Sequence, residues 1–236
     1  MSEWAPKRFW EAVSVEETKA GHELRLDGRP VRTPGKAPLA MPTGAMAEAA
    51  ADEWRAVGER IDPTVMPVTR SANSAVDKVR PQRDAVIGHL AEYGATDLLC
   101  YRAEGPEALA AMQAERWDPL LDWAAQRHAA RLSTVAGVMP VEQDPEALRR
   151  LRAPLDAATD FELTALHDLI SLPGSLVLGL AAAEGYGAPE DLWSLSRIDE
   201  DWQEGLWGVD EEAAERDRRR LEAYVHAHRF LALARA

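Results

Sequence analysis

The chain has 236 residues, of which 46% are hydrophobic and 28% are charged, and its formal net charge is −13. The length suits one large domain or two small ones, and the composition is that of an ordinary globular protein. The negative charge argues against nucleic acid and against an anionic membrane surface as partners, because both are recognised by basic surfaces.

The sequence lacks the signals of secretion, of a disulfide framework and of membrane insertion. Its single cysteine, Cys100, lies in the apolar run LLCY. We therefore expect a buried thiol in a reducing compartment. The first ten residues, MSEWAPKRFW, contain no apolar core of a secretory signal. No run of about 18 apolar residues occurs, so no membrane insertion is expected.

Residues 11–41 alternate between apolar and polar side chains in the manner of β-strands. The pair Asp27-Gly28 stands between two alternating runs and predicts a hairpin, because both turn residues need a positive φ. Pro30 cannot donate to a ladder, so its strand is expected to lie at an edge or to begin there. Residues 39–41 could add a third strand. The pattern predicts a small antiparallel meander that must pack on the rest of the chain.

From Thr43 onward the apolar residues recur with the helical period. Met46, Ala50, Trp54 and Val57 share one face of the first expected helix. Later helices are expected from Pro81, from about Pro106 to Ala130, from Pro145 after an Asp144 cap, from the Thr159–Glu162 capping box, from Leu176, from Pro189 and from an Asp210 cap.

Several prolines are expected to interrupt this helical region. Pro63 and Pro67 predict an extended connection, followed by a short helix from Ser71. Pro119 and Pro154 lie inside helical patterns. They predict kinks or breaks, because an internal proline removes a backbone hydrogen bond and clashes with the preceding turn.

The spacing of apolar residues also predicts which side chains face the core. Trp54 of the first helix is expected there. In the region 106–130 the expected inward residues are Leu109, Met112, Leu120 and Trp123, and in the last helix they are Ala214, Leu221, Val225, His228 and Ala232, with Leu231 beside them. The segment that begins at Leu176 is apolar on nearly all sides, so it is expected to be the central buried helix.

Together these patterns predict an α+β fold, in which a small N-terminal antiparallel β meander packs on a larger multi-helical C-terminal domain. The change of period near Met41 is the only boundary candidate. The predicted domains are therefore a β-rich N-terminal domain of residues 1–42 and a helical domain of residues 43–236.

The sequence shows no pattern typical of a catalytic, metal or cofactor site. It contains no GxGxxG, no P-loop, no HExxH and no paired CxxC. Of the six histidines only His226 and His228 are close, and two positions apart on a helix they point in different directions. The chain is therefore not expected to be an enzyme or to need a metal or cofactor.

The strongest candidate for a functional surface is the stretch WSLSRIDEDWQEGLWGVDEEAAERDRRR at residues 193–220. Between Asp199 and Asp217 it holds nine acidic residues, with Trp202 and Trp207 among them. Crowded carboxylates repel one another. Tryptophan provides a large contact area at low entropy cost. The two readings are a protein-binding surface and a solvated helix face whose tryptophan rings turn into the core.

Seven segments, taken together, carry a resemblance to a known family. They are RFW at 8–10, LDGRPVRTPG at 26–35, EW at 53–54, IDPTVMPVTRSANSAVD at 61–77, TDLLCYRA at 96–103, WDPLLDW at 117–123 and LSRIDEDWQEGLWG at 195–208. The chain thereby resembles the ATP synthase assembly chaperones that bind the alpha subunit of the catalytic head, which occur in mitochondria and related bacteria. The resemblance implies a β-rich N-terminal part, a helical C-terminal part and a non-enzymatic role.

That role implies that the chain binds the unassembled alpha subunit and prevents its aggregation until it pairs with the beta subunit. The expected client-binding residues are Arg197, Asp199, Glu200, Asp201, Trp202, Glu204 and Trp207. Glu200 and Glu204 are one helical turn apart, with no lysine on the helix to relieve their repulsion. We expect a monomer in the cytoplasm of bacteria, and in the mitochondrial matrix for eukaryotic relatives.

Two other functions stay open at this point. The acidic surface could belong to an adaptor or regulatory protein-binding module without chaperone activity, which would bind assembled complexes or unrelated proteins. The chain could also be an enzyme of unknown type, in which case the purified protein would carry a tightly bound metal or nucleotide.

Overall fold

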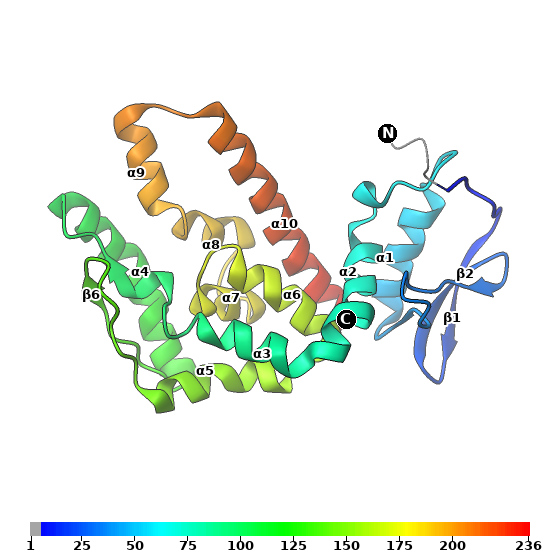
Figure 1. The fold of residues 1–236 in the computed structure, drawn as a ribbon, viewed down its shortest axis with the longest axis horizontal. Coiled ribbons are helices and arrows are strands. Elements are labelled where there is room, and N and C mark those ends of the chain that lie inside the picture. Colours follow the sequence, from blue (N-terminus) through cyan, green and yellow to red (C-terminus); the bar gives the residue numbers. More distant parts are fainter. Residues whose placement is uncertain (1–5) are drawn as a thin grey trace. The chain divides into compact units, whose positions relative to one another are not determined.

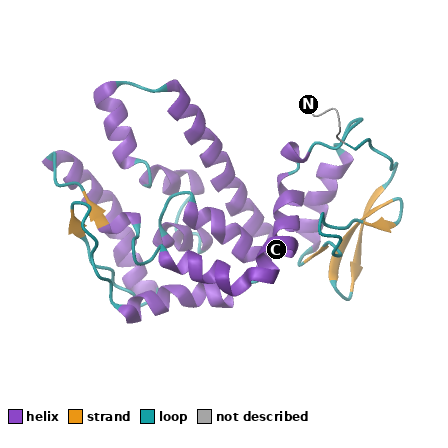
Figure 2. Ribbon diagram, in the orientation of Figure 1, coloured by secondary structure: helices purple, strands orange, loops and turns teal. Residues whose placement is uncertain are grey.

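The computed structural model describes residues 6–236; the first five residues of the segment MSEWAPKRFW lie outside the described residues. The predicted α+β class is confirmed, since an antiparallel sheet near the N-terminus is followed by a largely helical region (Figures 1 and 2). The chain divides into two compact units. Unit 1 comprises Met1–Arg83, Thr159–Ala165 and Arg229–Ala236, and unit 2 comprises Asp84–Ala158 and Leu166–His228.

The strands are β1 (Val13–Thr18), β2 (Gly21–Leu26), β3 (Arg29–Pro30), β4 (Ala40–Met41), β5 (Tyr101–Arg102) and β6 (Val135–Ala136). The α-helices are α1 (Gly44–Arg55), α2 (Pro67–Ser74), α3 (Arg83–Glu92), α4 (Glu107–Arg127), α5 (Pro145–Ala157), α6 (Asp160–Ser171), α7 (Leu176–Ala183), α8 (Pro189–Leu195), α9 (Ile198–Trp207) and α10 (Glu211–Arg235). After Met41 the chain is mainly helical, apart from the two-residue strands β5 and β6, whereas the first segment of unit 1 extends to Arg83. The predicted domains, residues 1–42 and residues 43–236, would each fold as a separate segment. That division stays a prediction.

In the N-terminal sheet, β2 pairs antiparallel with β1, β3 and β4. The predicted hairpin turn is confirmed, because Asp27 and Gly28 have φ angles of 48° and 77°. Pro30 lies in β3, which pairs with β2 alone and so forms an edge, as expected. Leu24 and Leu26 of β2 are both buried, which fixes the face of the sheet that turns toward the core.

A cluster of buried side chains beneath this sheet consists of Trp10, Leu26, Val57 and Met66. Trp54 packs against the cluster with its ring in an edge-on contact with Trp10, at a centroid distance of 5.1 Å. Trp54 is only partly buried, so its predicted place in the core is confirmed in part.

The expected extended connection at Pro63 and Pro67 is wrong. Pro63 begins a 3-10 helix and Pro67 begins α2. A proline is tolerated at the first helical position, because its missing N–H has no partner inside the helix. The Glu53 side chain on α1 accepts hydrogen bonds from the backbone N–H groups of Val68 and Thr69, at 2.7 and 2.8 Å, and so satisfies the start of α2.

The predicted central helix, α7, is confirmed: the residues from Leu176 to Ala182 are all buried. Asp97 lies at its N-terminus and is fully buried. Its carboxylate accepts hydrogen bonds from the Ser175 hydroxyl at 2.7 Å and from the Val177 N–H at 3.0 Å. Burial raises the pKa of Asp97 to about 6, and these hydrogen bonds oppose the increase.

The inward face predicted for α4 is partly wrong, and the helix runs unbroken through Pro119. Met112 is 39% exposed and Trp123 is half-buried, whereas Gln113 and Trp117 are buried. The spacing of apolar residues did not reveal this face, because the inward residue Gln113 is polar. Gln113 is tolerated there because it forms hydrogen bonds, and Trp117 donates to the Leu195 carbonyl at 2.7 Å.

Two further sequence predictions need the same kind of correction. Of the kink or break expected at Pro154, the break is wrong, because α5 continues through Pro154 to Ala157, and the kink stays a prediction. In α10 the buried residues are Tyr224, Ala227, Phe230 and Leu231, so of the residues predicted to face inward only the flanking Leu231 is buried. The two large aromatic rings determine which face of α10 is buried. The Asp210 cap is confirmed, since its carboxylate accepts from the N–H groups of Glu212 and Ala213.

Candidate interaction surface on α9

Chemistry-bearing side chains do not gather into a catalytic or metal site in the part of the chain that is described. Among residues 6–236, no group of three or more His, Cys, Asp or Glu side chains is placed to hold a metal ion. No described helix is long and apolar enough to cross a membrane. Cys100 is buried, as expected, and its burial raises the pKa of the thiol to about 12, so the thiol stays protonated and unreactive.

The acidic stretch folds mainly into α9 and the start of α10, both within unit 2 (Figure 1). Ile198 is the one residue of α9 that is buried. Gly208 ends the helix with a φ of 88°, a left-handed conformation that glycine adopts without strain. The chain then passes through Asp210 into α10. Helix α9 therefore makes limited contact with the core and leaves most of its surface open.

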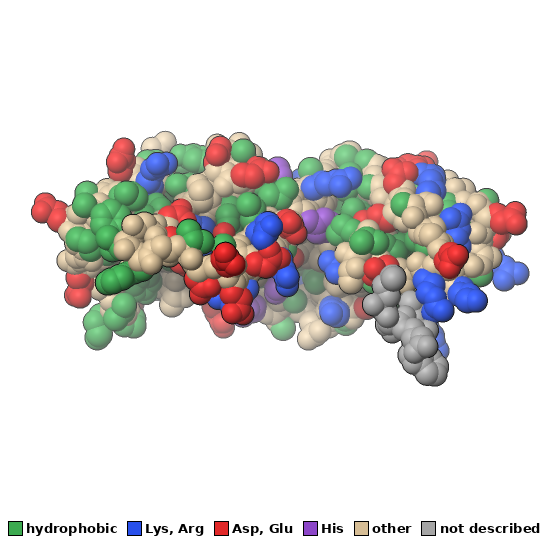
Figure 3. Space-filling model, turned by 90° about the horizontal axis from the view of Figure 1, so that it is seen from above, with side chains coloured by type: hydrophobic (Ala, Val, Ile, Leu, Met, Phe, Trp, Pro, Cys, Tyr) green, Lys and Arg blue, Asp and Glu red, His purple; other side chains and the backbone are tan. Residues whose placement is uncertain are grey.

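The tryptophan rings of this stretch do not both turn into the core. Trp207 is 82% exposed, and its neighbours Leu206 and Val209 are 60% and 66% exposed. Trp202 is half-buried. Figure 3 shows hydrophobic side chains lying open among acidic ones on the face seen from above. Large apolar side chains exposed together in this way are typical of a protein-interaction surface.

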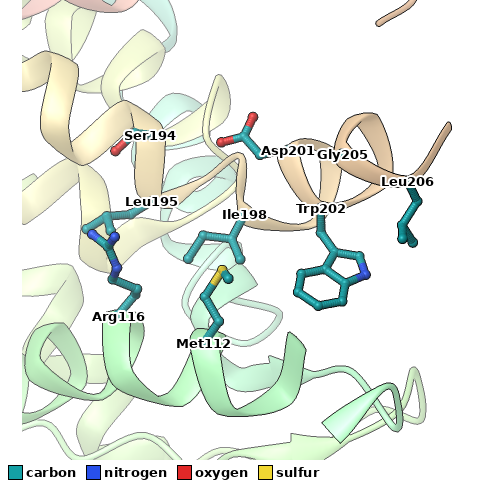
Figure 4. A pocket seen from close by; sticks show the side chains of 9 residues that line it. All are labelled: Met112, Arg116, Ser194, Leu195, Ile198, Asp201, Trp202, Gly205 and Leu206. Atoms are coloured by element: carbon teal, nitrogen blue, oxygen red, sulfur yellow. The ribbon is translucent and has the colours of Figure 1, made fainter. Parts of the chain in front are cut away.

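On one side of α9 lies a hollow of about 510 Å³, which we call the apolar groove. Its lining residues come from α4, α8 and α9 and are Met112, Arg116, Ser194, Leu195, Ile198, Asp201, Trp202, Gly205 and Leu206. Figure 4 shows Met112, Ile198 and Trp202 turned toward one another, while the Asp201 carboxylate points away from them. The floor and walls of the groove are therefore mostly apolar.

A second hollow of about 490 Å³ lies against α9 and the start of α10, and we call it the acidic hollow. Its lining residues are Arg197, Asp199, Glu200, Gln203, Glu204, Trp207, Gly208, Asp210 and Ala213. The seven predicted site residues therefore divide between the two hollows: Arg197, Asp199, Glu200, Glu204 and Trp207 line the acidic hollow, and Asp201 and Trp202 line the apolar groove.

Ion pairs distinguish the acids of α9 from one another. Arg197 lies 2.6 Å from the Glu200 carboxylate and 2.8 Å from that of Asp217 on α10. No lysine lies on α9, as the sequence indicated, but Arg197, which immediately precedes the helix, partly neutralises Glu200. Among the described residues Glu204 makes no ion pair. Asp201 likewise makes no ion pair among the described residues, so both carboxylates can gain from a cation supplied by a partner.

Asp199 connects α9 to α4. Its carboxylate accepts a hydrogen bond of 2.5 Å from the side-chain amide of Gln113, which is 1% exposed. The carbonyl oxygen of the same side chain accepts from the Ala103 N–H at 2.7 Å. A buried amide that lost the Asp199 carboxylate would keep an unsatisfied N–H, so Asp199 has a structural role in placing α9.

The surroundings of Asp201 disfavour the ionised form of its carboxyl group. Partial burial raises the pKa of Asp201 above its ordinary value, and the nearby carboxylates of Glu204, Asp217 and Glu200 raise it further. Arg197 opposes this increase. Like charges concentrated on one short helix favour a partner that brings positive charge.

Sequence reasoning missed the contribution of α4 to this surface. Met112 was assigned to the core by its spacing, and Arg116 carried no signal at all. Leu206 stands in an apolar trio with Trp207 and Val209 that spans the end of α9, and such a trio within an acidic run is a signal that could have identified it. The α4 residues could not be found in this way, because only folding brings Met112 and α9 together.

Comparisons with known proteins agree on one family. A family model described as "ATP12 chaperone protein" matches residues 7–125. A crystal structure of Atp12 from Paracoccus denitrificans is 53% identical, with a TM-score of 0.95, covering 98% of this chain and 100% of that chain. A crystal structure of an Agrobacterium tumefaciens protein is 43% identical, with a TM-score of 0.90, covering 98% of this chain and 85% of that one.

A mitochondrial protein of Schizosaccharomyces pombe named atp12 is also similar. It is 25% identical over 230 residues, which is 92% of this chain and 78% of the relative's length. The similarity thus extends well beyond the residues that the family model matches, and it includes α9.

Proposed function

Because the chain belongs to the ATP12 family of ATP synthase assembly chaperones, we propose that it binds the unassembled alpha subunit of the catalytic head and prevents its aggregation until the alpha subunit pairs with beta. The family is one of chaperones rather than enzymes. A subunit that awaits its neighbour exposes an apolar interface, which makes it prone to aggregate. A chaperone must cover that interface and later release it.

The observation that carries this proposal is the exposure of Trp207 beside the unpaired Glu204. Affinity in the micromolar range needs about 8 kcal/mol of binding free energy. An exposed ion pair contributes only about 0–1 kcal/mol. Apolar contacts must therefore supply most of the affinity, while the acids direct the encounter and set the specificity.

The proposed client-binding residues are Arg197, Asp199, Glu200, Asp201, Trp202, Glu204 and Trp207. Within this set the contacts suggest a division of roles. Trp207 and Glu204 face solvent or lack a partner and would meet the client directly. Asp199 and Arg197 hold α9 in place through Gln113 and Asp217.

We further expect the chain to act as a monomer, in the cytoplasm of a bacterium or in the mitochondrial matrix for eukaryotic relatives. Two points support this setting: the relatives with crystal structures come from bacteria, and the Schizosaccharomyces pombe relative is described as mitochondrial.

The test is the dissociation constant for purified, unassembled alpha subunit, measured for the parent chain and two variants. Trp207→Ala is expected to weaken binding by about 2 kcal/mol or more, since a central aromatic contact behaves as a hot spot. Glu204→Lys is expected to weaken binding at least tenfold, which is about 1.4 kcal/mol, and to reduce the dependence of the association rate on salt.

Glu17→Lys is the matched control for charge, because Glu17 is an exposed acid on β1, in unit 1. It changes the net charge by the same amount and should leave the dissociation constant within about twofold. If Glu204→Lys and Trp207→Ala both melt normally and bind like the parent, the client site lies elsewhere. If the parent itself fails to bind the alpha subunit, the proposed function is wrong.

A further inference from the structure

We propose that the apolar groove between α4 and α9 receives the apolar side chains of a basic amphipathic segment of the client. This deepens the proposed function, on which it rests, by stating the chemistry of the segment that is recognised and by adding α4 to the surface that recognises it. The acidic hollow holds most of the charge, whereas the groove offers the apolar contact area.

The volume and the lining of the groove suit an occupant that inserts several side chains. The volume of about 510 Å³ falls within the range of about 300–1,000 Å³ typical of binding pockets. Five of its lining residues are large and apolar: Met112, Leu195, Ile198, Trp202 and Leu206. Met112 on α4 is 39% exposed and Leu206 on α9 is 60% exposed, so apolar surface is uncovered on both facing helices. An occupant that covers both walls would remove this apolar surface from water, which favours binding.

A polar atom of the groove also lacks a partner. The indole N–H of Trp202 is buried and has no hydrogen-bond partner among the described residues. A buried donor without an acceptor is unfavourable by about 1–3 kcal/mol. A segment of protein chain bound along the groove brings backbone carbonyl groups that can accept this hydrogen bond, which a purely apolar ligand cannot do.

The charged residues near the groove indicate whether its occupant carries positive or negative charge. Helix α9 contains no lysine or arginine between Ile198 and Trp207; of its acids, Asp201 lines the groove, and Asp199, Glu200 and Glu204 line the adjoining acidic hollow. The opposite wall presents one arginine, Arg116. An occupant whose apolar side chains are directed at Met112 and Trp202, and whose lysine or arginine side chains reach past α9 to Glu204, complements the groove and the acidic hollow together. A neutral or acidic segment would leave Glu204, which makes no ion pair among the described residues, without a counter-charge.

The test compares three charge insertions at exposed apolar positions, with the dissociation constant for purified alpha subunit as the readout. Met112→Glu and Leu206→Glu place a carboxylate in the groove from its two walls, and each is expected to weaken binding at least tenfold. Val138→Glu is the matched control: Val138 is 90% exposed and belongs to unit 2, but it lines neither hollow. It should stay within threefold of the parent. Met112→Ala and Leu206→Ala repeat the comparison should a glutamate variant melt early.

A second arm identifies the segment. Overlapping peptides that span the alpha subunit are titrated against the parent chain and against Leu206→Glu. The peptides that bind the parent should pair large apolar residues with lysine or arginine and should lose affinity for the variant.

The outcomes separate this inference from the proposed function. If the parent binds the alpha subunit while all three glutamate variants bind equally well, the function stands and the groove is excluded. If the bound peptides are acidic or lack apolar residues, the stated chemistry is wrong. If light scattering shows that the parent is a dimer and Leu206→Glu is a monomer, the occupant is a second copy of the chain, which also overturns the inference. Failure of the parent to bind at all contradicts the proposed function itself.

Discussion

Phe9 and Trp10 are adjacent in sequence but differ completely in environment. Phe9 is 72% exposed, whereas Trp10 is 2% exposed and packs edge-on against Trp54. We expect Trp10→Ala to lower the free energy of unfolding by about 3–5 kcal/mol, because it leaves a large cavity. Phe9→Ala should change it by less than about 1 kcal/mol. Urea unfolding of both variants checks this, and equal midpoints would show that the cluster around Trp10 does not stabilise unit 1.

A pH dependence follows from Asp97. Its pKa in the folded chain is about 6, above the ordinary 3.8, so the folded state binds this proton more tightly than the unfolded state does. The stabilisation from the protonated carboxyl is fully present below about pH 4 and is lost as the pH rises through 6, a difference of about 3 kcal/mol.

Asp97→Asn cannot titrate and is the natural reference for that measurement. The stability advantage of the parent over Asp97→Asn should shrink by about 2.4 kcal/mol between pH 4 and pH 7, most of the full difference. Parallel pH profiles for the two proteins would mean that Asp97 ionises in the fold as readily as it does in water.

At the scale of elements, the sequence predicted best the features that depend on neighbouring residues. The Asp27-Gly28 turn, the Asp144 and Asp210 caps and the buried helix from Leu176 are all confirmed, because each is determined within a few residues. The Thr159–Glu162 capping box also forms, with both of its hydrogen bonds present.

Elements whose placement depends on distant partners were predicted less well. The start of α2 relies on Glu53 of α1, which accepts from the N–H of Val68, fifteen residues away in the chain. The inward face of α4 includes Gln113, whose hydrogen bonds go to Ala103 and Asp199. The spacing of apolar residues in the sequence does not indicate such distant hydrogen-bond partners.

Helix α9 offers a test of the distinction between structural and exposed acids. Asp199→Ala should lower the free energy of unfolding by about 1–3 kcal/mol, because it leaves the buried Gln113 amide without its acceptor. Asp199→Asn should restore most of the loss, since the asparagine carbonyl still accepts. Glu204→Ala, at an acid with no ion pair among the described residues, should change stability by less than about 0.5 kcal/mol. Equal changes in the free energy of unfolding for Asp199→Ala and Glu204→Ala would contradict the structural role of Asp199.

At the scale of the whole molecule, the α+β class and the chaperone family were both accessible from the sequence. The class followed from the change of period after Met41, and the family from seven short segments at consistent spacings. Two of these segments meet in unit 1, where the Asp77 carboxylate accepts from the Thr33 hydroxyl and from the Gly35 N–H. The groove was not accessible in this way, because it forms only when α4 and α9 pack together.

The most direct test of the central claim is light scattering from isolated alpha subunit, diluted into buffer with and without an equimolar amount of this chain. We predict that the chain keeps the alpha subunit in solution and that added beta subunit displaces it, whereas the aggregation of beta subunit alone is unaffected. Aggregation of the alpha subunit at the same rate with and without the chain would contradict the account.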